Sequence, residues 1–345
     1  MADDQTPTSD AFREQLLQDG LINNRDEIGM VPLTGGVSSD IFLVEQDGKR
    51  FVAKRALEKL RVKQDWYADT SRIKTEMACL ELFAGLAPGM TPQIIAARPD
   101  HGYVLMEFLD SSFINWKAIL LNGQCDTGHA FAAGDTLGII HRLTWNRPEL
   151  ERRFNALENF RQLRLNPYFA ILLNRHPDLR EAVENEINQL QCNRLCLIHG
   201  DYSPKNLLFS NARMVVLDWE TACYADPAFD IGFMLNHLVL KAVNRPHLAD
   251  DYYRLCQTAW HAYVMQIGNV RAAQVEPRLA KLLPLLLLAR IDGKSPVEYL
   301  ADTARHNLVR TMARTALVVP FVGVLPMCAG WIQQIKEWNH EHQNN

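Results

Sequence analysis

The sequence predicts an α+β protein of two lobes, in which a small, mainly antiparallel β lobe precedes a larger helical lobe. Short apolar runs separated by turn residues, typical of strands, occupy residues 21–107. Apolar residues at helical spacing prevail in residues 108–345. The chain of 345 residues is long enough for each lobe to bury its own core. We interpret residues 1–20 as a disordered tail of residues 1–10 and a short leading helix.

The small lobe is predicted to contain a hairpin, a third strand, a helix and two closing strands, at residues 31–44, 50–55, 71–86, 93–97 and 103–106. In the hairpin, a Gly-Gly turn joins two apolar runs. The third strand alternates in polarity and carries Lys54. The helix has apolar residues at helical spacing, with Ser71 as its expected N-cap.

The large lobe shows helical patterns at residues 131–144, 179–190, 231 onward, 248–266, 277–291 and 297–308. His141 ends the apolar face of the first of these helices, and we interpret it as a packed, hydrogen-bonded side chain. Pro284 interrupts a leucine-rich run whose simplest interpretation is core packing.

Composition narrows the possible classes of protein. Hydrophobic residues make up 48% of the chain and charged residues 22%, as in ordinary globular proteins. The net charge of -4 gives no overall positive field, so we expect no nucleic-acid partner. The seven cysteines are odd in number and scattered, which favours reduced thiols in a cytoplasmic protein. The polar, acidic start of the chain is unlike a secretory signal, and no pattern indicates an oligomeric state.

Residues 316–332 are uncharged and almost wholly apolar. A helix that crosses a bilayer needs about 20 such residues, and this run is shorter. Pro320, Gly323 and Pro326 also break it. We therefore expect a buried C-terminal element and no association with a membrane.

The most informative stretch lies between two apolar runs, residues 195–198 and 214–217, which both resemble strands. A polar loop between them carries Asp201 and Asn206, and Asp218 follows the second run. We expect these three side chains at neighbouring ends of the two strands. Carboxylate and amide oxygens in this order indicate a divalent metal such as Mg²⁺, although a lone Asp at a strand end is usually a turn former.

The sequences HGDYSPKN, LDWE and ADPAFDIG resemble the aminoglycoside phosphotransferase and choline kinase family, which are small-molecule kinases with a protein-kinase-like fold. The first resembles the kinase catalytic loop H-R-D-x-x-x-x-N, and the second contains the equivalent of the D-F-G aspartate. Gly200 stands where protein kinases have Arg, and Trp219-Glu220 replaces Phe-Gly. The resemblance covers residues 25–310 and implies an ATP-dependent phosphotransferase with a protein-kinase-like two-lobe fold.

The resemblance implies roles for the residues of the catalytic loop. Asp201 would be the base beside the acceptor hydroxyl, and Asn206 and Asp218 would hold Mg²⁺. Lys205 would reach the γ-phosphate, with a surface lysine as the alternative. His199 and Asp230 would give structural support. Asp230 would brace the loop through backbone N–H groups, with N-capping of the next helix as the alternative.

The hairpin would cover ATP, with Gly35, Gly36, Ser38 and Ser39 as the candidates for contact with phosphate. The pattern is not G-x-G-x-x-G, so a plain hairpin is the alternative. The backbone of the hinge residues Glu107, Phe108 and Leu109 would bind adenine; GTP is not excluded as the nucleotide.

Lys54 would hold the α- and β-phosphates, with Glu76 as its ion-pair partner. Glu81 is the alternative partner, and solvated charges are the plain interpretation of all three. Lys49 is a poorer choice because it belongs to a turn. The long connection at residues 56–70 is expected to overhang the cleft through Arg61, Lys63, Asp65 and Trp66, without an assigned role.

Arg290, Asp292 and Lys294 cluster in the polar segment of residues 289–300 and are weak candidates for the acceptor site, with an exposed loop as the alternative. Their mixed charge fits a zwitterionic or anionic acceptor no worse than an aminoglycoside. The brief stretch between Asp218 and Asp226 argues for a small hydroxylated substrate rather than a protein. A catalytically silent nucleotide-binding protein and a protein kinase are the alternative functions.

Overall fold

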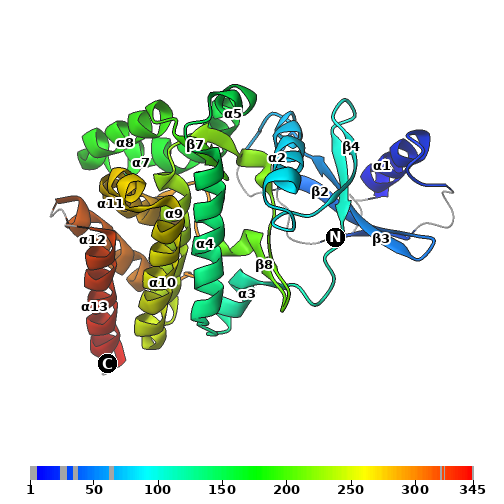
Figure 1. Cartoon of the computed structure of the whole chain (residues 1–345). Coiled ribbons are helices and arrows are strands. Elements are labelled where there is room, and N and C mark those ends of the chain that lie inside the picture. Colours follow the sequence, from blue (N-terminus) through cyan, green and yellow to red (C-terminus); the bar gives the residue numbers. More distant parts are fainter. Residues whose placement is uncertain are drawn as a thin grey trace.

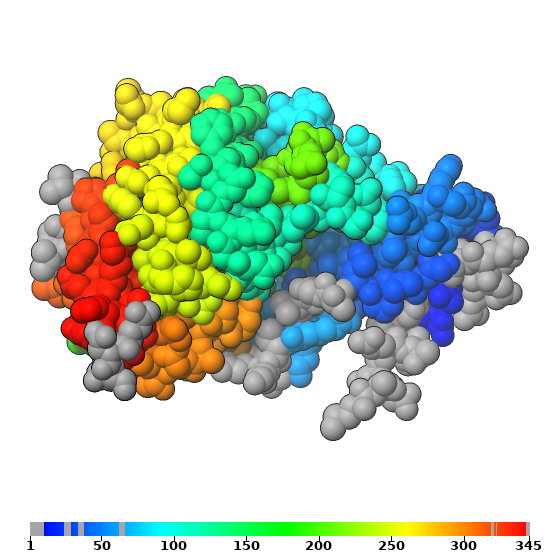
Figure 2. Space-filling model, turned by 90° about the horizontal axis from the view of Figure 1, so that it is seen from below, coloured from blue at the N-terminus to red at the C-terminus, as the bar shows by residue number. Residues whose placement is uncertain are grey.

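A computed structural model describes residues 6–23, 29–33, 38–61, 66–318, 321 and 323–343. It has the predicted α+β architecture of two lobes (Figure 1). The small lobe, blue and cyan, contains a five-stranded sheet, and the large lobe is mainly helical. Figure 2 shows the surface hollowed where the blue small lobe meets the green part of the large lobe.

The small-lobe sheet has the strand order β1-β2-β3-β5-β4, and every pairing in it is antiparallel. Its strands are β1 (Gly29–Pro32), β2 (Ser39–Gln46), β3 (Lys49–Ala56), β4 (Ile94–Arg98) and β5 (Tyr103–Glu107). This confirms the predicted hairpin, third strand and closing strands. The turn of the hairpin, with Gly35 and Gly36, lies outside the described residues.

Two helices cover the two faces of this sheet (Figure 1). Phe12 and Leu16 of α1 (Thr6–Gln18) pack with Ala53 of β3 in one apolar cluster. Helix α2 (Arg72–Leu86) packs on the other face, toward which Ala56 points. Because side chains alternate along a strand, Lys54 shares the face of Ala56 and points toward α2.

Helix α1 corrects the prediction that residues 1–10 form a disordered tail, since the helix begins at Thr6. Pro7 falls in its first turn, where the missing N–H costs no hydrogen bond. The polar composition of residues 1–10 had suggested that they are disordered. The ring of Phe12, with its centroid 5.3 Å from that of Tyr103, fixes the helix on the sheet.

The large lobe contains α3 (Trp116–Leu121), α4 (Thr127–Thr144), α5 (Pro148–Arg153), α6 (Leu157–Phe160), α7 (Ile171–Arg175), α8 (Arg180–Cys192), α9 (Ala228–Asn244), α10 (Ala249–Ile267), α11 (Asn269–Asp292), α12 (Thr303–Val318) and α13 (Val324–Gln343). A π-helix, η1 (Arg161–Ala170), joins α6 to α7. Short 3-10 turns occupy η2 (Pro177–Leu179), η3 (Pro204–Asn206), η4 (Trp219–Thr221) and η5 (Pro246–Leu248).

Helices α4 and α10 pack unusually closely. A Cβ on Gly134 would lie 2.1 Å from the carbonyl oxygen of Ala259, and one on Gly138 would lie 2.5 Å from Cβ of Gln266. Only glycine permits this approach. The contact holds α4 beneath the catalytic loop, where the hydroxyl of Tyr202 donates to the carbonyl of Ala133 at 2.8 Å.

Pro284 does not interrupt α11, which runs unbroken from Asn269 to Asp292 with Pro277 also inside it. The leucine-rich run is core, as expected, and its packing outweighs the hydrogen bonds that the prolines remove. The apolar segment of residues 316–332 is divided between the end of α12 and the start of α13, where Met327, Cys328 and Trp331 are buried. Among the described residues, every helix is too short or too polar to span a bilayer.

The two strands of the central stretch are β7 (Cys196–Ile198) and β9 (Met214–Val216), but they are not neighbours in one sheet. Strand β7 pairs with β10 (Cys223–Ala225), whereas β9 pairs with β8 (Leu207–Phe209), which also pairs with β6 (Ile114–Asn115). The stretch expected as a polar loop thus contains a strand that forms its own hairpin.

Candidate active site

A cavity of about 450 Å³ lies between the two lobes. Its apolar walls include Leu33, Ile41 and Val52 from the small lobe, and Leu208 and Leu217 from the large lobe. Its polar side is formed by residues that the sequence singled out: Ser38, Ser39, Lys54, Glu76, Glu107, Lys205, Asn206 and Asp218. Phe108 and Leu109 also line it. Such a cavity suits a flat apolar ring joined to a charged group.

The backbone N–H of Glu107 donates to the carbonyl of Gln93 at 2.8 Å. Its carboxylate forms an ion pair with Arg213, and the guanidinium of Arg50 lies 4.8 Å from the ring centroid of Phe108. The N–H of Glu107 is therefore already committed within the protein. Leu109 and Phe108 are the remaining candidates among the three predicted hinge residues.

Lys54 bridges the two lobes at the polar end of the cavity. Its Nζ lies 2.7 Å from Oε2 of Glu76 and 2.6 Å from Oδ1 of Asp218. Glu81, the alternative partner, instead pairs with Arg153 at 3.1 Å on the surface. Glu76 is thus the glutamate that meets Lys54.

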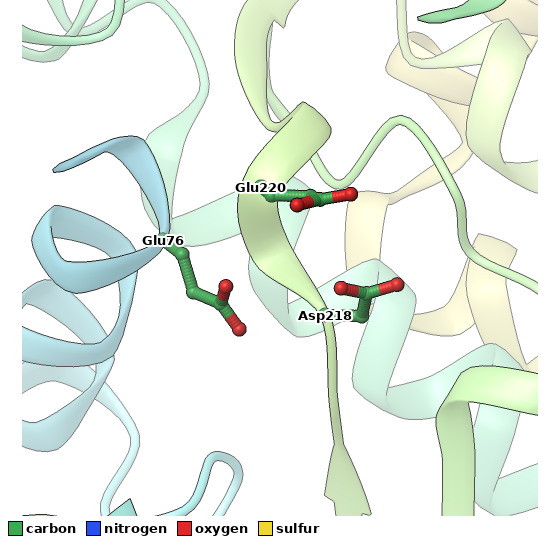
Figure 3. Close-up of side chains that lie close together, drawn as sticks. All are labelled: Glu76, Asp218 and Glu220. Atoms are coloured by element: carbon green, nitrogen blue, oxygen red, sulfur yellow. The ribbon is translucent and has the colours of Figure 1, made fainter. Parts of the chain in front are cut away.

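Glu76, Asp218 and Glu220 form a cluster in which carboxylate oxygens lie within 4.8 Å of one another (Figure 3). Burial raises the pKa of Glu76 to about 7, and the charges of Asp218 and Glu220 add to this effect. Burial also opposes ionisation of Asp218, but Lys54 holds its pKa below the ordinary value. The cluster has three carboxylates against the two cations Lys54 and Arg72. A site with excess negative charge and oxygen donors fits a hard divalent cation.

Asp218 adopts a left-handed backbone conformation, with φ of 68°. Such a conformation is uncommon outside glycine and, in residues with a function, often marks a position held by its surroundings. Asn206 lies close to Asp218, because the N–H of Leu217, the residue before Asp218, donates to the carbonyl of Asn206 at 2.9 Å. This bond extends the pairing of β8 with β9 and brings Asn206 beside the end of the strand that leads to Asp218.

Arg72, which is fully buried at the start of α2, was not singled out from the sequence. Its Nε donates to Oε2 of Glu220 at 3.0 Å, and its other nitrogens donate to the carbonyls of Ser38, Leu57, Ala68 and Asp69. The hydroxyl of Ser39 contacts the same Glu220 oxygen at 3.4 Å. Glu220 and Arg72 therefore fasten the exit of the hairpin to the large lobe.

Asp201 is 4% exposed; its carboxylate forms ion pairs with two side chains and accepts a hydrogen bond from a third. Its Oδ2 lies 3.0 Å from Nη2 of Arg164, 2.8 Å from Nζ of Lys205 and 3.0 Å from Nδ2 of Asn206. Burial opposes ionisation, but Arg164 and Lys205 hold the pKa of Asp201 below its ordinary value. Asp201 is therefore a charged carboxylate at neutral pH.

Gly200 explains the missing arginine of the catalytic loop. Its φ is +74°, and a Cβ there would lie 2.6 Å from the carbonyl oxygen of Thr221. No side chain fits, so the cation comes from elsewhere. Arg164, on the π-helix η1, donates through Nε to the carbonyl of Gly200 at 2.6 Å and pairs with Asp201. Irregular helical turns of this kind are frequent at functional sites.

Asp230 is buried in the first turn of α9 and accepts from two backbone groups, the N–H of His199 at 2.6 Å and that of Gly200 at 2.9 Å. Asp230 is therefore not the N-cap of α9: that position is Pro227, and the N–H of Ala228 donates to Asp226 at 2.9 Å. His141 is packed as predicted, with Nδ1 2.9 Å from the hydroxyl of Tyr263.

The two ring nitrogens of His199 have different partners. Nε2 lies 2.8 Å from the carbonyl of Leu217, so it carries the proton, and Nδ1 accepts from the N–H of Asp201 at 3.1 Å. Burial lowers the pKa of His199, which favours this neutral form. The ring thus joins the loop that carries Asp201 to the strand that leads to Asp218.

A second cavity, of about 260 Å³, adjoins the first. The two share Ser38, Lys117, Lys205 and Asp218, so they meet beside the charged cluster. The second cavity is further lined by Leu60, Trp66, Arg164, Tyr168, Asp201, Ser203, Glu220, Phe233, His237, Lys241, Arg290, Ser295, Glu298 and Tyr299.

Only one of the three weak candidates for the acceptor site, Arg290, lines the second cavity. Asp292 instead forms ion pairs with His176 at 2.9 Å and with Arg310 at 2.7 Å. The Nζ of Lys294 lies 5.5 Å from the ring centroid of Trp66. Arg290 and Asp292 both lie in α11, and residues two positions apart on a helix point to different sides, so the sequence cluster separates.

Trp66 belongs to the connection that was expected to overhang the cleft without an assigned role. Its Nε1 donates to the carbonyl of Gln162 at 3.2 Å, and it packs with Leu60 and Leu163. The connection thus reaches the large lobe and closes one side of the second cavity. Arg61 forms an ion pair with Asp40, whereas Lys63 and Asp65 lie outside the described residues.

Comparisons with solved structures show the same fold. A Plasmodium vivax ethanolamine kinase has a TM-score of 0.53 and 12% identity, with 97% of this chain and 89% of that chain covered. A choline kinase from Cryptosporidium parvum has a TM-score of 0.55 and 14% identity, with 95% of this chain and 99% of that chain covered. A choline/ethanolamine kinase family protein from Mesorhizobium loti has a TM-score of 0.52 and 14% identity, with 95% of this chain and 99% of that chain covered. No protein in the curated set matches significantly.

A family model described as the phosphotransferase enzyme family matches residues 29–265, which include the hairpin, Lys54, the catalytic loop and Asp218. This match covers more than half of the 345 residues and confirms the predicted relationship to aminoglycoside phosphotransferases and choline kinases. The chain belongs to the phosphotransferase enzyme family and is a small-molecule kinase.

Proposed function

We propose that the protein transfers the γ-phosphate of ATP to a hydroxyl group of a small molecule. The observation that carries this proposal is the meeting of two cavities at Lys205 and Asp218, with the carboxylate of Asp201 in the second. A nucleotide in the first cavity and an acceptor in the second would meet beside these residues.

The larger cavity would hold the nucleotide. Leu33, Val52 and Leu208 would cover the base, and the backbone near Leu109 would bind its edge. Lys54, held by Glu76, would bind the α- and β-phosphates. Lys205 would face the γ-phosphate. Contact with the base through backbone groups does not exclude GTP.

Asn206 and Asp218 would hold Mg²⁺, which when bound would neutralise charge on the phosphate oxygens. Both line the nucleotide cavity. Two hydrogen bonds from Nδ2 of Asn206 to Asp201, at 3.0 Å to the carbonyl and at 3.0 Å to Oδ2, fix the plane of its amide. Glu220 lies in the same acidic cluster but is committed to Arg72.

Asp201 would accept a hydrogen bond from the acceptor hydroxyl and orient it toward the γ-phosphorus. The hydroxyl oxygen forms a bond to phosphorus while the bond from phosphorus to the β,γ-bridging oxygen breaks, which releases ADP. The hydroxyl proton passes to Asp201 and then to solvent. Because the pKa of Asp201 is lowered, it is a weak base and takes the proton late.

The acceptor should be small. The second cavity, at about 260 Å³, is below the range of about 300–1,000 Å³ that is typical for drug-sized ligands. Only seven residues separate Asp218 from Asp226, which leaves little chain to bind a peptide. Amino alcohols, sugars and related metabolites fit this size better than an aminoglycoside of several rings.

The test is Asp201→Asn, with ATP turnover measured against a panel of hydroxylated metabolites. We expect kcat to fall about 100-fold or more, on the scale of general-base catalysis, while ATP binding by calorimetry changes little. Asp250→Asn, in a surface pair with Lys336, is the matched control and should keep full activity. Full turnover by Asp201→Asn would refute the proposed role. ATP binding without turnover of any acceptor by the wild type would favour a silent nucleotide-binding protein.

A further inference from the structure

We propose that the acceptor carries an anionic group, a carboxylate or a phosphate, in addition to the hydroxyl that is phosphorylated. This inference rests on the proposed function and identifies the class of its acceptor. It comes from the buried cations Lys241 and Arg290, which line the second cavity.

Lys241, on α9, is 1% exposed and lines this cavity. Its Nζ lies 3.4 Å from the carbonyl of His237 and 4.9 Å from the ring centroid of Tyr299. Both contacts are to neutral groups. In the part of the chain that the structure describes, no carboxylate forms an ion pair with Lys241.

Arg290, on α11, is 8% exposed and also lacks a carboxylate partner among the described residues. Its Nη1 donates to the hydroxyls of Tyr168, at 3.2 Å, and Ser295, at 3.1 Å, and to the carbonyl of Ser295. Its Nε is buried without a hydrogen-bond partner in the described structure. A guanidinium with an open donor is suited to binding a carboxylate or phosphate.

Other groups of the second cavity add charge and hydrogen-bond donors. Lys117, which lines both cavities, forms an ion pair with Glu298. The hydroxyls of Ser203 and Tyr299 are buried and have no partner among the described residues. The second cavity therefore offers cations without an ion-pair partner, and hydroxyls without a hydrogen-bond partner, to an acceptor.

Burying a cation without an ion-pair partner costs free energy, and the lowered pKa values of two buried groups reflect this cost. Burial lowers the pKa of Lys241 to about 7, and the charges of Lys117 and Arg290 add to the effect. Burial and the same surrounding cations also lower the pKa of His237 well below its ordinary value. An anion would offset these costs, whereas a cationic acceptor such as choline or an aminoglycoside would be repelled.

The cations without an ion-pair partner are distinct from those that hold the carboxylates of the reacting site. Asp201, beside the shared boundary of the cavities, already has Arg164 and Lys205 as partners, and Glu220 has Arg72. Of the Lys and Arg side chains that line this cavity in the described residues, Lys241 and Arg290 are those without an ion-paired acid. The acceptor would therefore place its hydroxyl at Asp201 and its anion at Lys241 and Arg290.

The test uses two matched series of probes that differ mainly in charge. The first is 3-amino-1,2-propanediol, glycerol, glycerate and glycerol 3-phosphate; the second is ribose, ribonate and ribose 5-phosphate. Binding to the full chain with Mg²⁺ and a non-hydrolysable ATP analogue is measured by calorimetry. We expect the anionic members to bind at least 10-fold more tightly than the neutral members. The carboxylate and phosphate arms show which anion is preferred.

Lys241→Met keeps the length of the side chain and removes the charge. Loss of one partner from a buried charge pair should weaken binding of the preferred anionic probe by about 30-fold or more. Arg290→Met should have a similar effect. Lys336→Met, which removes an exposed lysine in a surface pair, is the control and should leave binding unchanged.

Equal or tighter binding of the neutral or cationic members of both series would overturn the inference. So would an anion preference that survives in Lys241→Met, if near-UV circular dichroism shows that variant to be folded. Because these are binding measurements, they are separate from the proposed function, which fails only if no acceptor is phosphorylated.

Discussion

The pair formed by Arg164 and Asp201 allows a sharp prediction. Arg164→Met removes the cation that contacts both Asp201 and the carbonyl of Gly200. Breaking a buried ion pair costs about 3–5 kcal/mol. Lys205, 2.8 Å from the same oxygen but with a side chain that is 48% exposed, still neutralises part of the charge. We therefore expect the lower limit, about 3 kcal/mol of unfolding free energy.

A double-mutant cycle with Asp201→Asn isolates the pair. When Asp201 is neutral, Arg164→Met should cost only its hydrogen bond to Gly200 and its packing, about 1 kcal/mol. The coupling free energy should then be about 2 kcal/mol, measured by urea unfolding with tryptophan fluorescence. Arg161→Met is the matched control, because Arg161 lies on the same π-helix and pairs with Glu158 on the surface at 2.7 Å.

The pH dependence of this coupling has a defined sign. Because the pKa of Asp201 is lowered in the folded state, its stabilising contribution is complete above the unfolded value of 3.8. The coupling should therefore be as large at pH 5 as at pH 7, and should disappear only as the pH falls below that value. A coupling below about 0.5 kcal/mol, or an equal cost for Arg161→Met, would refute the inferred pairing.

Three further predictions concern other groups. Burial raises the pKa of Glu186 from 4.5 to about 7, so ionising it in the folded state costs up to about 3 kcal/mol; Glu186→Gln should raise stability at pH 8 but not at pH 4, as urea titrations at both values would show. Lys241 has a pKa of about 7 and faces Lys117, Glu298, Arg290 and His237, so it should lose its charge as the pH rises. KM for an anionic acceptor should therefore increase about 10-fold between pH 6 and pH 8, while kcat changes little. A KM that does not change with pH would contradict this prediction. Removal of divalent cations with EDTA should abolish turnover, Mg²⁺ should restore it, and Asn206→Ala should raise the Mg²⁺ concentration needed for half-maximal rate; an unchanged requirement would remove Asn206 from the metal site.

Local sequence patterns predicted the fold and the part of the candidate site that lies within short motifs. The spacing of Asp201, Asn206 and Asp218 was informative because one loop and one strand carry them. Lys54 and Glu76 were singled out by the resemblance to the kinase V-A-I-K strand and its glutamate partner, and periodicity placed them on a strand and a helix. Glu220 could have been added, since it follows Asp218 closely in the same motif.

Residues brought to the site by long-range packing were not predicted. Arg164 meets Asp201 from a π-helix 36 residues before Gly200, and the helical repeat of its segment gives no sign of that contact. Lys241 reaches the second cavity from the last turn of a buried helix, whereas Trp66 lies on the connection that was expected to overhang the cleft. Pro284 lies inside α11, within the helical pattern predicted for residues 277–291: a proline weakens a helix locally, but burial of the surrounding leucines stabilises it.

The wall that Trp66, Leu60 and Ser38 give to the second cavity has a kinetic consequence. These residues belong to the small lobe, whereas Asp201 and Lys241 belong to the large lobe. Opening the lobes to release ADP would therefore also dismantle the acceptor pocket. Acceptor affinity should depend on whether nucleotide is bound, and initial-rate kinetics should show synergy between the two substrates rather than independent saturation.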